Sequence, residues 1–170
     1  MNSAERRDKI LEILKTEEEP VKGNRLADIL GVTRQIIVQD IAILRAEGIK
    51  ILSTPQGYIL SSSDKGKYTK VIASKHYFDR TEEELNTIVD NGGKVLDVIV
   101  EHPIYGEIRG LLMISSRYDV ERFMESVKNA KATLLSSLTE GVHLHTVEAD
   151  SKEVLDRIEK KLKEKGFFVE

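Results

Sequence analysis

Two histidines separated by one residue, His143 and His145, have the spacing in this sequence most suited to a shared chemical task. They lie in segment 141–149, where apolar and polar residues alternate in a way that predicts a half-buried strand. Residues two apart on a strand point to the same face, roughly 6.5–7 Å apart. The two imidazoles could therefore converge on one metal ion, or they could form a solvated or hydrogen-bonded pair. A metal site needs at least one more ligand.

Further ligands must be histidine or carboxylate, because the chain has no cysteine. His76 and Glu84 are the candidates to join His143 and His145 in one site. Three nitrogens and one oxygen suit a borderline divalent ion such as zinc, nickel, iron or manganese. The residues alone leave two alternatives open. His76 could be an ordinary loop histidine, and Glu84, three residues after Thr81, could complete a capping box at the start of a helix.

The segment that must position these side chains is 67–170, which we predict to be a second domain. Its predicted strands cover 68–75, 95–100, 108–114, 141–149 and 167–169, and its predicted helices cover 81–91, 116–130 and 151–165. Loop 131–140 has no pattern that can be assigned. His102, held before Pro103 in a turn, is expected to be structural. This order predicts an α+β fold, an α/β sandwich in which helices cover an antiparallel sheet.

Residues 1–60 have a different pattern, in which three helices precede a hairpin. The predicted helices cover 3–15, 24–30 and 33–47, and the predicted strands 49–52 and 58–60. Gly31 is placed to end the second helix in the left-handed conformation, and Thr33 is a good N-cap for the third. The apolar face expected for the second helix consists of Leu26, Ala27, Ile29 and Leu30. The pattern is that of a winged helix-turn-helix, followed by a small, polar linker at 61–66.

The third helix of a helix-turn-helix can lie in the major groove of DNA, with its first residues at the base edges. The residues predicted to contact DNA are Thr33, Arg34, Gln35, Val38 and Gln39. Glutamine pairs well with adenine, and arginine with guanine or phosphate. Residues 1–60 hold nine Lys/Arg and nine Asp/Glu, so their neutral charge gives no independent support for DNA binding. The alternative is a small helical domain that only dimerises.

The composition of the chain limits the class of protein and the number of domains that can be expected. The chain has 170 residues, 40% hydrophobic and 32% charged, with a net charge of −3. These values suit a soluble protein of one domain or two small ones. We find no apolar run of membrane-spanning length and no signal-peptide pattern, so a cytoplasmic protein is expected. There is no glycine-rich phosphate loop, and no nucleophile stands in a recognisable triad.

The two halves together resemble the nicotinic-acid-responsive transcriptional repressors. The helix-turn-helix part resembles them in the run Thr33-Arg34-Gln35-Ile36-Ile37-Val38-Gln39-Asp40-Ile41-Ala42-Ile43-Leu44-Arg45. The second part resembles the family's three-histidine (3H) domain in His76, in His102-Pro103-Ile104-Tyr105-Gly106-Glu107 and in Gly141-Val142-His143-Leu144-His145-Thr146. The resemblance covers nearly the whole chain, and the combination is more specific than either motif alone.

The resemblance implies a repressor of genes for NAD biosynthesis or niacin uptake, with nicotinic acid as co-repressor and operator DNA as partner. It also implies a divalent metal, nickel or zinc, held by His76, Glu84, His143 and His145, which favours the metal role of Glu84 over the capping role. A homodimer is expected, because two-fold operators favour dimers. Two other functions remain: a regulator that senses metal without an organic effector, and a hydrolase that uses a metal-bound water. We expect no enzyme, because no further general base or oxyanion donor can be named near the site.

Overall fold

A computed structural model describes residues 1–61 and 67–169. The chain divides into two compact units, Met1–Ser63 and Asp64–Glu170, and each contains its own hydrophobic core. Apart from Ser61, the predicted linker 61–66 lies outside the described residues. Within the described part, no helix is both long and apolar enough to cross a membrane.

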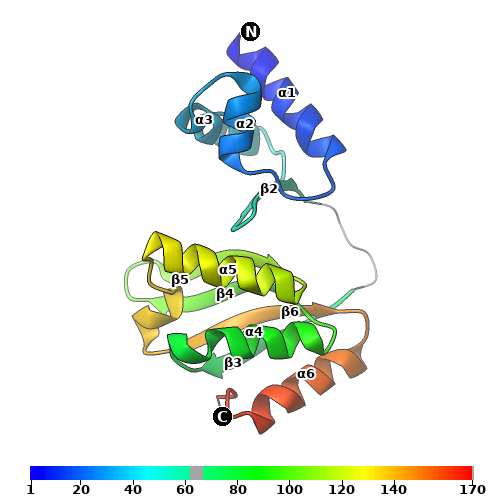
Figure 1. The fold of residues 1–170 in the computed structure, drawn as a ribbon, viewed down its shortest axis with the longest axis vertical. Coiled ribbons are helices and arrows are strands. Elements are labelled where there is room, and N and C mark those ends of the chain that lie inside the picture. The colour runs from blue at the N-terminus through cyan, green and yellow to red at the C-terminus, as the bar shows by residue number, and fades with distance from the viewer. Residues whose placement is uncertain (62–66, 170) are drawn as a thin grey trace. The chain divides into compact units, whose positions relative to one another are not determined.

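The first unit confirms the predicted winged helix-turn-helix (Figure 1). Its helices are α1 (Ser3–Thr16), α2 (Gly23–Leu30) and α3 (Arg34–Ala46), and its hairpin consists of β1 (Ile51–Thr54) and β2 (Gly57–Leu60). Gly57 is required at the hairpin turn. Its φ is +130°, and a Cβ there would lie 2.4 Å from the Val21 carbonyl oxygen. This close approach lets Val21 pair with Tyr58, which ties the hairpin to the segment before α2.

Both predicted caps of the helix-turn-helix are present. Gly31 ends α2 in the left-handed conformation, and the Thr33 hydroxyl accepts a hydrogen bond from the Ile36 amide at the start of α3. Two details differ from prediction. Ile29 is 53% exposed and lies outside the buried face of α2. The first hairpin strand begins at Ile51, because the Ile49 amide still bonds back to the end of α3.

The second unit is an antiparallel sheet with helices, as predicted. Its strands are β3 (Tyr68–Lys75), β4 (Lys94–His102), β5 (Gly106–Ile114) and β6 (Val142–Ala149). Its longer helices are α4 (Thr81–Asp90), α5 (Arg117–Ala130) and α6 (Lys152–Glu164). The strand order is β3-β6-β4-β5, with every pairing antiparallel. The three helices lie on one face of the sheet and bury its apolar side chains (Figure 1).

The sheet is irregular beside the predicted site. Strand β4 slips in register against both neighbours between Val95 and Ile99, so Asp97 lies at a bulge. Residues opposite each other share a face, and Val98 lies opposite Gly110 while Asp97 lies opposite Leu111. Val98 packs against the helix-covered core together with Leu112 of β5, so Val98 faces the helices and Asp97 faces away from them.

Two segments near the site differ from the sequence-based expectation. The predicted strand at 167–169 is reduced to a single antiparallel bridge between Phe168 and Ser74 on β3, with one backbone hydrogen bond on each side of it. The unassigned loop 131–140 contains a short 3-10 helix, η2 (Leu135–Thr139). A second 3-10 helix, η1 (Phe78–Arg80), leads directly into α4.

Candidate metal centre and recognition helix

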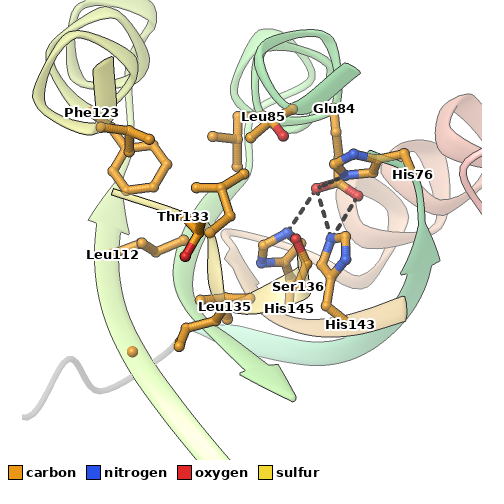
Figure 2. A pocket seen from close by; sticks show the side chains of 15 residues that line it. His76, Glu84, Leu85, Leu112, Phe123, Thr133, Leu135, Ser136, His143 and His145 are labelled. Atoms are coloured by element: carbon orange, nitrogen blue, oxygen red, sulfur yellow. Dashed lines mark hydrogen bonds and ion pairs between the residues drawn. The ribbon is translucent and has the colours of Figure 1, made fainter. Parts of the chain in front are cut away.

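The four predicted metal ligands lie together in the second unit (Figure 2). His76 follows β3, Glu84 lies on α4, and the other two histidines lie on β6. All four side chains are buried, and Glu84 is only 1% exposed. Its Oε1 atom lies 2.9, 3.1 and 2.8 Å from the Nε2 atoms of His76, His143 and His145, respectively.

Each imidazole is oriented by a backbone carbonyl that contacts its Nδ1 atom. The Nδ1 atoms of His76, His143 and His145 lie 2.8, 2.8 and 2.7 Å from the carbonyl oxygens of Tyr77, Gly141 and Asp97, respectively. A carbonyl only accepts hydrogen bonds, so each Nδ1 must carry the proton. All three Nε2 atoms are therefore directed at Glu84, the arrangement by which proteins orient metal-binding histidines.

Glu84 is not part of a capping box. The residue at the N-cap of α4 is Arg80, and Thr81 is already helical, so the Thr81-x-x-Glu84 spacing does not match the cap geometry. The Glu84 side chain turns inward, where Ser74 Oγ contacts its second oxygen. The Thr81-x-x-Glu84 spacing is compatible with a capping role and with a metal-binding role for Glu84. Only the position of β6, whose two histidines lie beside Glu84, distinguishes the two roles.

The cluster shifts the ionisation of its members. Burial alone would raise the pKa of the Glu84 carboxyl, but the charge of His145 and the contacts with all three histidines hold that pKa well below its ordinary value. Burial would lower the pKa of His76 and of His145, yet the nearby Glu84 carboxylate raises both above the ordinary value. Glu84 therefore stays ionised, and these two imidazoles gain affinity for protons or for another cation.

These residues fit a divalent metal ion. Ligand atoms of His76, Glu84 and His143 all lie within 4.8 Å of one another, and His145 Nε2 contacts the same carboxylate. His76 Nε2 is close to Glu84 but poorly aligned, and it has no hydrogen-bond partner among the residues described. A buried nitrogen without a partner is costly unless something else binds it. Three neutral imidazoles and one carboxylate form a donor set suited to zinc or nickel.

Gly141 joins two of the histidines, a role that the sequence did not suggest. Its carbonyl oxygen accepts the His76 amide proton as well as the Nδ1 proton of His143. Its own amide donates to the Ser136 carbonyl on η2. With φ at +90°, and with a Cβ that would lie 2.4 Å from the His76 carbonyl oxygen, only glycine fits this position.

An apolar cavity of about 220 Å³ adjoins the cluster (Figure 2). The cluster forms one part of the cavity wall, and the rest is mainly apolar. The apolar side chains are Leu85, Val98, Leu112, Phe123, Val127, Leu134 and Leu135. A neighbouring hollow of about 400 Å³ shares His76 and Ser136 and brings in Lys128 and Lys131. Neither space could be predicted, because the residues around them come from distant parts of the chain.

The predicted DNA-contacting residues lie on one accessible part of α3 and its cap. Thr33, Arg34, Gln35 and Gln39 are exposed, and Val38 is half-buried. The opposite side, with Ile37, Ile41 and Leu44, is buried in the core of the first unit. The accessible side is polar or basic at the N-terminal end of the helix, as a helix that enters the major groove requires.

Two ion-pair contacts that the sequence did not reveal fix the position of α3. The buried Asp40 carboxylate lies 2.6 Å from Arg6 Nε and 3.7 Å from Arg7 on α1. Arg45 donates to the Ile51 carbonyl and the Ser53 hydroxyl on β1. Helix α3 is therefore held to both α1 and the hairpin.

The architecture defines a DNA-binding regulator, with a helix-turn-helix unit followed by a unit built around a histidine-rich cluster. Residues 6–59 match the HTH domain family, and residues 69–170 match the 3H domain family. The "Probable transcription repressor NiaR" of Thermotoga maritima is 48% identical over 98% of this chain and 94% of its own. The "Transcription repressor NadR" of Bacillus subtilis is 39% identical over the same shares. The chain belongs to this NiaR/NadR family of transcription repressors, which are named for DNA-binding regulation and not for catalysis.

Proposed function

We propose that this protein represses genes for NAD biosynthesis or niacin uptake, with nicotinic acid as co-repressor and a bound divalent metal ion, nickel or zinc. The observation that carries the proposal is the position of the histidine–glutamate cluster beside a small apolar cavity in the second unit. The resemblance to nicotinic-acid-responsive repressors supplies the identity of the ligand.

The cavity has the size and chemistry for a single flat ring. Ligands of drug size occupy roughly 300–1,000 Å³, so about 220 Å³ suits a smaller molecule. Phe123, Leu112 and Leu135 offer apolar surface to the ring (Figure 2). The charged end of the molecule would face the cluster, and Lys128 and Lys131 in the adjoining hollow favour the approach of an anion.

His76, Glu84, His143 and His145 would hold the metal ion. When bound, the ion would supply a positive charge and an open coordination position for a carboxylate or a pyridine nitrogen. The chain's own contribution is orientation: three backbone carbonyls hold the imidazoles in the required tautomer.

The exposed side of α3 would read the operator, through Thr33, Arg34, Gln35, Val38 and Gln39. A homodimer would present two copies of α3 to a two-fold operator. Nicotinic acid would then favour the arrangement of the two helix-turn-helix units that matches the spacing of the half-sites.

A regulator that senses metal alone is the second candidate, because the cluster could bind an ion without any organic ligand. The cavity favours the first candidate, since a sensor of metal alone has no use for apolar space beside its ligands.

One experiment separates the two. Binding of the full-length protein to promoter fragments is measured after chelation, with metal restored, and with metal plus nicotinate; bound metal is determined on the same samples. We expect tight binding only when both metal and nicotinate are present. Full binding with metal alone would favour the metal sensor, and binding unaffected by either would refute both candidates.

A further inference from the structure

The Thr81 hydroxyl is a buried polar group without a hydrogen-bond partner in the described part of the chain. Thr81 is the first residue of α4 and is only 5% exposed, yet its Oγ1 has no hydrogen-bond partner within the described chain. Its side chain lines the cavity beside the histidine cluster. Buried hydroxyls are almost always bonded, so this exception requires an explanation.

Helix capping does not provide that explanation. Arg80 occupies the N-cap of α4 without a capping side-chain bond, and Glu84 points into the cluster. Thr87, one residue before Ile88 on the same helix, shows the ordinary case: its buried hydroxyl donates to the Glu83 carbonyl and contacts Lys165 Nζ. Thr81 thus differs from a matched neighbour: its hydroxyl is buried without a partner among the described residues, and its side chain lines the cavity.

The position of this hydroxyl suits an anionic ligand. Thr81 and Glu84 are three residues apart on one helix, so their side chains are neighbours on the same helix face. Thr81 therefore lies beside Glu84 and lines the same cavity as the cluster. The first turn of α4 carries the carboxylates of Glu82, Glu83 and Glu84, so the helix N-terminus itself does not attract an anion. A carboxylate in the cavity would be held there by the hydroxyl, which can donate a hydrogen bond to it.

We propose that Thr81 donates a hydrogen bond to the carboxylate of the ring-shaped effector bound in the cavity. This assignment rests on the proposed function, since it takes a pyridine carboxylate as the ligand. Thr81 is then a binding residue that helps to distinguish a carboxylate-bearing ring from an uncharged ring of the same size. The unpaired hydroxyl is kept in the free protein because the ligand satisfies it.

The test compares three variants of the full-length, metal-loaded protein by calorimetric titration with nicotinate. Thr81→Val removes the hydroxyl and keeps the shape, Thr81→Ser keeps the hydroxyl, and Thr87→Val is the matched control on the same helix. We expect Thr81→Val to bind nicotinate roughly tenfold to a hundredfold more weakly, the usual effect of losing a hydrogen bond to a charged group. Thr81→Ser and Thr87→Val should stay within a few-fold of the wild type.

The melting temperature of the ligand-free protein gives an independent measurement, in which Thr87→Val should lose stability and Thr81→Val should not. Removing a buried hydroxyl that has no partner should leave the melting temperature of the ligand-free protein unchanged or higher for Thr81→Val. Thr87→Val should lower it, because that hydroxyl is bonded. Equal nicotinate affinity in Thr81→Val and the wild type, or equal losses in Thr81→Val and Thr81→Ser, would overturn the assignment of Thr81 alone. A wild-type protein that binds no nicotinate would overturn the co-repressor proposal, and this assignment with it.

Discussion

Glu84 is a carboxylate almost without contact with water, and its neighbours are His76, His143, His145 and the Ser74 hydroxyl. A buried charge is stable only when it is well paired. In the metal-free protein, His76 and His145 provide that pairing when they are protonated, since the Glu84 carboxylate raises the pKa of both. A divalent cation would replace these protons without moving the ligands far.

Replacing His143 and His145 together by alanine should reduce bound divalent metal to background. Both side chains come from the same face of β6, so the change removes two of four ligands from one strand. Elemental analysis of the purified protein measures the result, and a circular dichroism spectrum checks that the fold persists. His102→Ala is the control, because His102 only accepts amide protons in an exposed turn. Unchanged metal content in the double variant would refute the ligand set.

The stability of the metal-free protein and the stabilising effect of added metal should change with pH in opposite directions. The pKa values of His76 and His145 are raised above 6.5, so the metal-free folded state retains protons that the unfolded state releases. Their stabilising contribution is full below that value and is lost as pH rises through the folded-state pKa values. Metal requires deprotonated imidazoles, so its stabilising effect should grow over the same range.

Thermal melts across neutral pH, with added metal and with chelator, measure both slopes. The double variant at positions 143 and 145 is the control, and metal should not shift its melting temperature. A metal-free protein whose stability rises through this range would contradict the ionisation described for the cluster.

The histidine spacing selected His143 and His145, and the family resemblance was needed to add His76 and Glu84; neither explains how the side chains are held. Histidine spacing on a strand is a local property, and so is the Thr81-x-x-Glu84 spacing that suggested a cap. The contacts that hold these side chains are tertiary. The Gly141 carbonyl accepts a hydrogen bond from the His76 amide, and the Asp97 carbonyl contacts Nδ1 of His145. Local spacing contains no information about either contact.

At the level of secondary structure, α3 is held on two sides while its polar N-terminal end stays accessible. We expect Arg34→Ala and Gln35→Ala each to cost about 1–3 kcal/mol in specific operator binding if each reads a base. Neither side chain belongs to the buried face, so the melting temperature should hardly change. Fluorescence anisotropy with operator and scrambled DNA measures the loss. Lys15→Ala, exposed at the end of α1, is the control, and operator affinity that is intact in both variants would show that α3 does not face the groove.

The turn between η2 and β6 depends on Gly141. Gly141→Ala should weaken metal binding on the order of 10–100-fold, the usual effect of disturbing the partners that orient metal ligands. Gly106→Ala is a matched control: it also has positive φ, at +75°, but an added Cβ there meets nothing within 4 Å. Metal titration of both variants separates the steric effect from the cost of the backbone conformation. Equal metal affinity in the two would show that the Gly141 contact does not position the histidines.

Periodicity predicted the elements well where one face is buried along the full length. It failed at the ends and in loops. The residues at 167–169 are all apolar and look like a strand, but they form only one bridge with β3, at Ser74. Ile29 fits the apolar stripe of α2 by type yet lies outside the buried face. Segment 131–140 lacks a periodic pattern because several of its residues line the cavity and because the Gly141 amide donates a hydrogen bond to the Ser136 carbonyl.

At the scale of the whole molecule, control of operator binding by a ligand of the other compact unit requires thermodynamic coupling between the two binding events. If nicotinate tightens operator binding, operator DNA must tighten nicotinate binding by the same factor, typically corresponding to about 1–3 kcal/mol. Calorimetric titration of nicotinate into the metal-loaded protein, and into its operator complex, measures one side of this relation. Scrambled DNA is the control. Equal nicotinate affinities in the two titrations would rule out co-repression.

The bulge at Asp97 connects the two faces of the sheet. Its backbone carbonyl accepts the Nδ1 proton of His145, while its carboxylate, on the other face, accepts the Thr146 amide proton and a bond from Arg109. Arg109 is exposed, so a substitution on the outer surface reaches a buried imidazole through a single residue. In the metal site proposed above, a substitution at position 109 would therefore change how His145 is held while every proposed ligand is retained. Divergence in metal response between relatives should therefore be sought at position 109 as well as in the cluster.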